Sequence, residues 1–249
     1  MSFAGKRVLV TGATRGIGLA TARAFLAAGA RVAVNGTTPS KVAAVCGELG
    51  AGAVPAAGDI ATAAGCEAVV AAALDRLGGL DVLVNNAGVY VEGPFEAVDE
   101  ATWDRVVDVN VKGTFFCTRA ALGALRRARG AVVNVASESG VWGYALGTVY
   151  CAAKGAVVNL TRALAIEFAP EVRVNAVGPG PIATDMLKAQ VDSAPDPAAH
   201  ALLLNAWAPM RRVGRPEEVA AAILFLASDA CRFVTGANLR IDGGATAGR

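Results

Sequence analysis

Two residues four positions apart suit proton chemistry. The segment YCAAK contains Tyr150 and Lys154, a spacing that places both side chains on one face of a helix. A free phenol has a pKa near ~10 and is too weak an acid to exchange protons readily at neutral pH. An ammonium ~4 Å away, at an effective dielectric of ~20, favours the phenolate by ~4 kcal/mol, or ~3 pKa units. We therefore expect Lys154 to bring Tyr150 toward neutrality, as a general acid or base.

A serine lies thirteen positions before Tyr150. Ser137 ends the apolar run GAVVNVAS, and chemistry in parallel sheets is found at the carboxyl ends of strands. At that place Ser137 would donate a hydrogen bond to a substrate oxygen. Glu138 follows directly, and the sequence leaves open whether it contacts a substrate hydroxyl or amine or faces solvent. The single histidine, His200, and five scattered cysteines have no metal-ligand spacing, so no metal site is predicted.

The segment TGATRGIG, residues 11–18, resembles a phosphate-binding loop. Its glycines are Gly12, Gly16 and Gly18, at positions one, five and seven rather than the one, three and six of the common dinucleotide fingerprint. The loop joins an apolar strand to an amphipathic helix. Glycines let the backbone approach a pyrophosphate, and a helix N-terminus offers unpaired N–H groups. The loop therefore predicts a dinucleotide site, and a tight structural turn is the alternative for the glycines alone.

Short apolar runs alternate with longer alanine-rich segments along the whole chain. We expect helices over residues 16–28, 62–77, 100–127 and 149–168. The strands are continuously apolar, as expected when both faces of a parallel sheet are covered. The pattern predicts an α/β fold: one Rossmann-type domain over residues 1–249, with a doubly wound sheet of about seven parallel strands and helices on both faces. Residues 183–210, rich in proline, break the rhythm and are expected to form a substrate lid.

Composition narrows the classes of protein. The 249 residues are 54% hydrophobic and 18% charged, which permits a large core. A net charge of +2 gives no reason to expect nucleic acid as a partner. No apolar run approaches the ~18 to 20 residues of a membrane span, and the N-terminus does not resemble a signal peptide. We therefore expect a cytoplasmic enzyme or binding protein that contacts neither nucleic acid nor membrane.

Taken in order, the motifs resemble the short-chain dehydrogenase/reductase family. The match includes the glycine loop, NNAG at 85–88, YCAAK, PGPIAT at 179–184 and the closing VTGANLRIDGG. The resemblance implies a homotetramer or homodimer in which the helices beginning near Glu100 and Val149 pair between subunits. Asn110 would hold a water on a proton path to Lys154, with a helix-packing amide as the alternative, and Lys154 would also bind the nicotinamide ribose. The implied catalytic set is Asn110, Ser137, Tyr150 and Lys154.

The resemblance also implies a nicotinamide cofactor. An acidic residue after the second strand would bind the ribose hydroxyls of NAD, but the strand here ends in Asn35, Gly36 and Thr37. Arg15 in the glycine loop is placed to meet a ribose phosphate, so NADP is favoured over NAD. For Asp59, a strand-end cap is the alternative to adenine contact. The expected cofactor-binding residues are Gly12, Thr14, Arg15, Gly16, Ile17, Gly18, Asn35, Thr37, Asp59, Ile60, Asn86, Ala87, Gly88, Tyr150, Lys154, Pro179, Gly180, Ile182 and Thr184.

The predicted function is NADP(H)-dependent interconversion of a ketone and a secondary alcohol. Residues 138–146 and the lid would line the substrate pocket, with Trp142, Tyr144, Leu146, Met186, Leu187, Leu202 to Leu204 and Trp207 as candidate lining residues. One alternative is a β-ketoacyl-[acyl-carrier-protein] reductase, whose acidic carrier protein would dock on Arg126, Arg127 and Arg129, although Glu171 opposes it. Another is a non-catalytic NADP-binding regulator, which the complete catalytic set disfavours.

Overall fold

The computed structural model describes residues 1–248 as one domain built on a seven-stranded parallel sheet. The strands follow the order β3-β2-β1-β4-β5-β6-β7. β1 to β3 are added toward one edge of the sheet and β4 to β7 toward the other, so the order of addition reverses between β1 and β4. This confirms the predicted doubly wound fold. The strands are β1 (Arg7–Val10), β2 (Arg31–Val34), β3 (Ala53–Pro55), β4 (Val82–Asn85), β5 (Ala131–Val135), β6 (Arg173–Pro179) and β7 (Asn238–Ile241).

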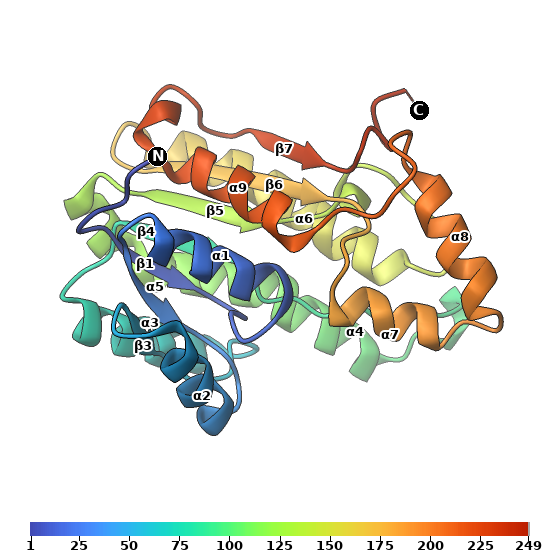
Figure 1. Ribbon diagram of the computed structural model, residues 1–249, viewed down its shortest axis with the longest axis horizontal. Coiled ribbons are helices and arrows are strands. Elements are labelled where there is room, and N and C mark those ends of the chain that lie inside the picture. The colour runs from blue at the N-terminus through green and yellow to red at the C-terminus, as the bar shows by residue number, and fades with distance from the viewer. Residues whose placement is uncertain (249) are drawn as a thin grey trace.

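Helices follow nearly every strand and cover both faces of the sheet (Figure 1). Three of the four helices expected from the sequence begin and end within one residue of their observed bounds. The helices are α1 (Gly16–Ala27), α2 (Pro39–Leu49), α3 (Ala63–Leu77), α4 (Glu100–Val107), α5 (Gly113–Ala128), α6 (Thr148–Phe168), α7 (Asp185–Asp192), α8 (Pro197–Trp207) and α9 (Pro216–Ala227).

Each strand divides its side chains between two cores. In β1, Val8 and Val10 enter the core beneath α1, α2 and α9, whereas Leu9 enters the core beneath α3, α5 and α6. In β4, Val84 and Leu83 divide in the same way. Because side chains alternate along a strand and both faces are buried, most positions in the central strands are apolar. This explains the continuous apolar runs in the sequence. Parallel pairing places the carboxyl ends of the strands along one edge.

The predicted helix over 100–127 is divided by a π-helical segment. α4 ends at Val107, residues Asp108–Lys112 form one wider turn, and α5 continues from Gly113. A π-turn inserts one residue into the helical ladder and often occurs at functional sites. The inserted turn contains Asn110, whose side chain is buried. This turn could not be predicted from the sequence, because its residue types are also compatible with an ordinary helix.

The segment over residues 183–210 is more regular than its prolines suggested. It forms α7 and α8, which Figure 1 shows beyond the carboxyl ends of β5 and β6. Pro197 is accommodated because it stands in the first turn of α8, where no N–H is needed. Thr184 and Asp196 accept hydrogen bonds from the first turns of α7 and α8, respectively. The two helices therefore lie at the edge of the sheet where the site is expected.

Helix α6 is long and apolar. Within residues 1–248 it is the one helix that reaches the length and mean hydropathy of a membrane span, although the sequence had shown no such run. Its buried residues include Lys154 and Thr161 as well as Val157 and Leu164, and they pack toward β6 and α4. Core helices of globular domains have the same composition, and α6 is such a core helix here.

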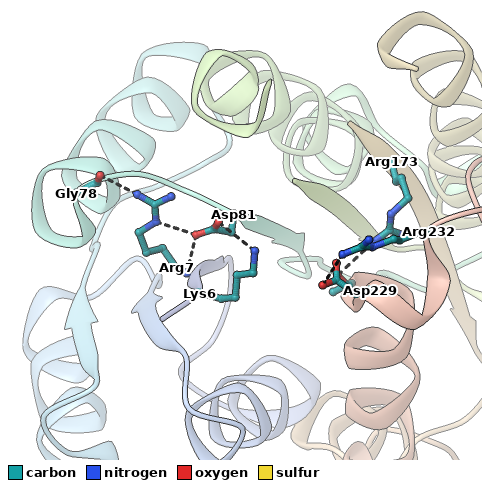
Figure 2. A network of polar contacts seen from close by, with 8 residues as sticks. Lys6, Arg7, Gly78, Asp81, Arg173, Asp229 and Arg232 are labelled. Atoms are coloured by element: carbon teal, nitrogen blue, oxygen red, sulfur yellow. Dashed lines mark hydrogen bonds and ion pairs between the residues drawn. The ribbon is translucent and has the colours of Figure 1, made fainter. Parts of the chain in front are cut away.

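Charged side chains fix the amino ends of the strands (Figure 2). Asp81, just before β4, accepts hydrogen bonds from the Arg7 backbone N–H at 3.0 Å and from Arg7 Nε at 2.7 Å. Lys6 Nζ lies 3.6 Å from the same carboxylate. Arg173, which begins β6, donates to the carbonyl oxygens at the end of α9, including Leu226 at 2.7 Å. These contacts tie β1 to β4 and β6 to α9 at the edge opposite α7 and α8.

Candidate active site

A cavity of about 710 Å³ lies at the carboxyl ends of the strands, between the glycine loop and helices α7 and α8. Asn110 is the one predicted site residue that does not line it; its amide is buried behind Gly88. The structure thus brings together side chains from across the chain. The predicted residues that line the cavity are Gly12, Thr14, Arg15, Gly16, Ile17, Gly18, Asn35, Thr37, Asp59, Ile60, Asn86, Ala87, Gly88, Ser137, Tyr150, Lys154, Pro179, Gly180, Ile182 and Thr184.

Tyr150 and Lys154 lie on the same face of α6, one turn apart, as their spacing predicts. Lys154 Nζ is 5.6 Å from the centroid of the Tyr150 ring. The ammonium donates a hydrogen bond to the Val135 carbonyl oxygen at 2.9 Å, which anchors it to the end of β5. Lys154 is 3% exposed. Both groups therefore reach the cavity from α6, and the bond to Val135 fixes the Lys154 ammonium against the end of β5.

The acid–base properties of this pair differ from the sequence-based expectation. Burial raises the pKa of Tyr150 well above its ordinary value; the field of Tyr144 adds to this, and a hydrogen bond from Ser137 opposes it. Burial also lowers the pKa of Lys154 to about 8. The expectation that Lys154 brings the phenol toward neutrality is wrong for the protein alone. Loss of hydration disfavours both charged forms and is the largest cause of both pKa shifts.

Ser137 begins a short 3₁₀ turn at the end of β5. Its Oγ accepts a hydrogen bond from the Ser139 N–H at 3.1 Å and lies 3.0 Å from Ser139 Oγ. Ser137 is 8% exposed and still lines the cavity. Ser139 lines the same wall and was missed by sequence reasoning, since a second serine beside a first gave no separate signal. The bond from Ser139 thus holds the Ser137 hydroxyl beside Tyr150.

The amide of Asn110 lies behind the cavity wall, next to Gly88. Its Nδ2 donates to the carbonyl oxygens of Val89 and Val106, both at 2.9 Å, which fixes the orientation of the amide. Its Oδ1 is buried and accepts no hydrogen bond from residues 1–248. A Cβ added to Gly88 would lie 2.8 Å from this oxygen and 3.4 Å from Lys154 Nζ. Gly88 therefore leaves the space that separates the amide oxygen from the ammonium.

The glycine loop is held by the segment after β4. Thr11 Oγ1 accepts hydrogen bonds from the N–H groups of Asn86 and Ala87, at 3.0 and 3.1 Å. Asn86 Nδ2 donates in turn to the Thr11 carbonyl oxygen at 2.8 Å. At Gly12, φ is +61°, and an added Cβ would lie 2.8 Å from the Ala87 Cα, so glycine is required there. Sequence reasoning had not placed Thr11 in the site, although it is part of the motif.

The start of α1 is suited to an anion. Arg15 is its N-cap residue, and within the described chain no side chain caps the helix and no acidic residue stands in its first turn. The first N–H groups of α1 line the cavity, and such groups bind phosphates. Asn35 lines the cavity and also contacts the loop: its Oδ1 accepts from the Gly12 N–H, and its Nδ2 donates to the Ala56 carbonyl oxygen. The Asn35 side chain thus supports the loop.

Beyond Tyr150 and Lys154, polar side chains line the other part of the cavity. The Tyr90 ring meets the Tyr150 ring edge to face, with centroids 5.0 Å apart. Tyr90 OH donates to Glu92 Oε2 at 2.8 Å, and Gln190 Nε2 from α7 donates to the same oxygen at 3.2 Å. Sequence reasoning missed Tyr90, Glu92 and Gln190. Tyr90 and Gln190 are 100 positions apart, and no local pattern indicates such a contact.

Glu138 contacts the end of α8. Its Oε2 accepts a hydrogen bond from Trp207 Nε1 at 3.1 Å, which joins the end of β5 to the end of α8. Glu138 also lines the cavity, so it does not simply face solvent. The predicted pocket is partly correct. Tyr144, Met186, Leu187, Leu203, Leu204 and Trp207 line the cavity, whereas Trp142, Leu146 and Leu202 do not.

The arginines proposed as a docking surface lie at the end of α5. Arg126 Nε forms an ion pair with Glu171 at 2.8 Å. The pair cancels one of the positive charges on which the docking of an acidic carrier protein would depend. Arg127 and Arg129 remain close to this end of the helix.

Comparisons with known proteins agree with this geometry. The family described as "Enoyl-(Acyl carrier protein) reductase" matches residues 12–246. The chain is 42% identical over 248 residues to 2-(S)-hydroxypropyl-CoM dehydrogenase 3 of Xanthobacter autotrophicus, covering 96% of each chain. It is 40% identical to meso-2,3-butanediol dehydrogenase of Serratia marcescens, covering 99% of this chain and 97% of the relative. A Brucella melitensis 3-ketoacyl-(acyl-carrier-protein) reductase, solved with NADH, shares 34% identity and a TM-score of 0.90, covering 98% of this chain and all of its own.

A doubly wound sheet with a glycine loop and a tyrosine–lysine helix at one edge defines a dinucleotide-dependent oxidoreductase. The chain belongs to the short-chain dehydrogenase/reductase family. It is therefore an oxidoreductase acting on the CH–OH group, as the motifs predicted.

Proposed function

We propose that this protein is an NADP(H)-dependent oxidoreductase that interconverts a ketone and a secondary alcohol. The observation that carries the proposal is the position of Tyr150 and Lys154. Both reach one cavity, the other end of which is formed by the glycine loop and the start of α1. A proton-transferring group and a dinucleotide-binding edge in one cavity provide the two parts of the reaction.

The residues at the glycine-loop end fit a dinucleotide. The uncapped start of α1 offers N–H groups to a pyrophosphate, and Asp59 and Ile60 line the part of the cavity beside β3. Ile182 and Thr184 line the part nearest the lid. Lys154 is the group on α6 that would bind the nicotinamide ribose. When bound, the cofactor supplies or accepts the hydride and, in its oxidised form, a positive charge.

Tyr150 is proposed as the group that transfers the proton. Because burial raises its pKa, the hydroxyl is protonated at neutral pH and is ready to donate to a developing alkoxide. In the opposite direction it must lose this proton before it can accept one from an alcohol, so oxidation should be favoured at higher pH. Ser137 would hydrogen-bond the same substrate oxygen and orient it.

Lys154 and Asn110 are proposed to return the proton to Tyr150. A lysine with a pKa of about 8 exchanges protons readily near neutral pH. The buried Asn110 Oδ1 and the Lys154 ammonium both face the space that a side chain on Gly88 would fill, and the Asn110 amide is oriented by two hydrogen bonds. We propose that it holds a water on the proton path to Lys154. An amide with only a packing role would have no need of an unpaired buried oxygen, which is costly.

The proposed preference for NADP rests on charge at the glycine-loop end of the cavity. Arg15 is exposed there, 3.9 Å from Asp185 of α7, and Thr37 follows β2 where NAD-dependent enzymes carry an acid. The Brucella relative solved with NADH makes NAD the alternative. Arg15→Glu should lower kcat/KM for NADPH by about tenfold to hundredfold and leave NADH nearly unchanged. The control is Arg23→Gln, an exposed position on the same helix that does not line the cavity. Equal losses for both cofactors would contradict the preference for NADP.

Three further proposals follow from the prediction. Helices α7 and α8, over residues 183–210, act as the substrate lid, since both contribute side chains to the cavity. The exposed apolar residues Trp103, Phe115 and Ile166 support a homodimer or homotetramer formed through α4, α5 and α6.

The five free cysteines fit the reducing cytoplasm. We favour a small-molecule ketone over an acyl carrier protein as the partner, because Glu171 neutralises Arg126.

A further inference from the structure

The charged groups of the cavity are unevenly distributed. Within residues 1–248, the arginines and lysines that line it are Arg15 and Lys154. Arg15 lies at the start of α1, and Lys154 is anchored to the Val135 carbonyl oxygen. Of the four carboxylates in the described chain that line the cavity, Asp185 lies beside Arg15 and Asp59 follows β3, whereas Glu92 and Glu138 line the part beside Tyr90 and α8. A negative group on the substrate would therefore meet negative charge in this part of the cavity.

Neighbouring neutral donors hold both carboxylates in place. Glu92 Oε2 accepts from Tyr90 OH at 2.8 Å and from Gln190 Nε2 at 3.2 Å. Glu138 Oε2 accepts from Trp207 Nε1 at 3.1 Å. Glu92 contacts the hydroxyl of Tyr90, whose ring packs on Tyr150, and the charge of Glu138 acts on Tyr150 to raise its pKa. Fixed acceptors beside the reacting centre favour a substrate that can donate hydrogen bonds.

The single histidine adds a different group to the same wall. His200 stands on α8 and lines the cavity. Its Nε2 is buried and has no hydrogen-bond partner among the residues that the structure describes. A buried polar atom without a partner is costly, so a ligand that pairs with it would gain affinity. The wall thus combines carboxylate acceptors with a ring nitrogen that still needs a partner.

We propose that the substrate is a ketone or secondary alcohol that carries a further hydroxyl and no anionic group. Glu92, Glu138 and His200 would bind this hydroxyl. A hydroxyl both donates and accepts, so it can pair with a carboxylate and with an imidazole together. A carboxylate on the substrate only accepts and would be repelled by both glutamates. An ammonium only donates. This inference rests on the proposed function and specifies its substrate class.

The test compares ketones of one carbon skeleton. Reduction of 4-hydroxy-2-butanone, 2-butanone, acetoacetate and 4-(dimethylamino)-2-butanone is followed by loss of NADPH absorbance. The wild type should use the hydroxyketone about tenfold better than butanone in kcat/KM and about a hundredfold better than acetoacetate. In the double variant Glu92→Gln/Glu138→Gln, the ratio of kcat/KM for the hydroxyketone to kcat/KM for acetoacetate should fall by about tenfold or more. His200→Leu should lower kcat/KM for the hydroxyketone and for none of the other ketones.

The control is Glu171→Gln, which removes a carboxylate that is paired with Arg126 outside the cavity. It should leave every ratio unchanged. If the wild type had as high a kcat/KM for acetoacetate or the aminoketone as for the hydroxyketone, the inference would be wrong. This comparison needs no variant. An unchanged ratio in the double variant would also overturn it. If no ketone were consumed with NADPH or NADH, the proposed function would fail and the inference with it.

Discussion

The two edges of the sheet treat their polar groups in opposite ways. At the amino ends, Asp81 is paired with Arg7 and Lys6, and Arg173 meets the carbonyl oxygens that end α9 (Figure 2). At the carboxyl ends, Lys154 is buried with one backbone acceptor and a pKa lowered to about 8. Asn110 Oδ1 there is buried and accepts no hydrogen bond within the described chain.

The difference separates stability from function. Paired groups at the amino ends lower the free energy of the folded state, whereas groups with incomplete partners at the carboxyl ends raise it. Perturbed pKa values and unpaired buried atoms collect where a ligand can supply what the protein lacks. Substitutions at the two edges should therefore change stability in opposite directions, and only one edge should affect catalysis.

The largest change in stability is expected from Asp81→Asn at the amino edge. This substitution weakens the bonds to Arg7 and leaves its guanidinium without a charged partner, at a cost of about 2–4 kcal/mol in unfolding free energy. Urea unfolding measures the loss, and kcat/KM of the folded variant should stay within about twofold of the wild type. A comparable loss of kcat/KM would contradict the separation of the two edges.

Acid should produce the same effect in the wild type. Burial of the Asp81 carboxyl acts to raise its pKa, but the hydrogen bonds and charge of Arg7 outweigh it, so the pKa is lowered. A lowered carboxyl pKa gives stability that is present above the ordinary value near ~4 and is lost as the pH falls through the folded-state pKa. The difference in stability between wild type and Asp81→Asn should therefore shrink in acid. A constant difference down to strongly acidic pH would show that the carboxylate charge is not the cause.

A smaller change of opposite sign is expected from Lys154→Met at the carboxyl edge. The pKa of Lys154 is lowered from 10.5 to about 8, so burial of the charged form costs about 3 kcal/mol below pH 8. Methionine avoids this cost but leaves the Val135 carbonyl oxygen without its donor. The net gain in unfolding free energy should be about 1–3 kcal/mol at pH 7, with activity lost.

The pH dependence identifies the cause of that gain. Between about pH 8 and pH 10.5, Lys154 is neutral in the folded wild type but still protonated in the unfolded chain. The unfolded state then binds one more proton, so stability increases with pH. Wild-type stability should therefore rise toward that of the variant over this interval. A gain that is independent of pH would point to better packing by methionine and not to the buried charge.

The smallest effect is a shift in pH dependence caused by Glu138→Gln. The negative charge of Glu138 is one of the groups that raise the pKa of Tyr150, after burial and the field of Tyr144. Its removal should lower that pKa, so the rise of alcohol oxidation with pH should move to lower pH. Initial rates measured across pH 7 to 11 test the direction. Glu171→Gln is the matched control and should give no shift.

The sequence was sufficient for the fold and for most of the site. The apolar strands and the spacing of Tyr150 and Lys154 depend on local periodicity, which a sequence displays directly. The contact of Tyr90 with Gln190 joins distant segments and has no local signal. The direction of the pKa shift of Tyr150 was also missed, because burial is a property of the folded packing. The π-turn at Asn110 likewise depends on packing.

The most direct test of the account is the rate of NADPH-dependent ketone reduction by Tyr150→Phe, measured beside its unfolding free energy. Phenylalanine keeps the ring that packs on Tyr90 and removes only the hydroxyl. The account predicts a rate at least about a hundredfold to ten-thousandfold below that of the wild type, with stability equal to or slightly above it. A variant that retains most of its activity would contradict the assignment of Tyr150 as the proton-transferring group.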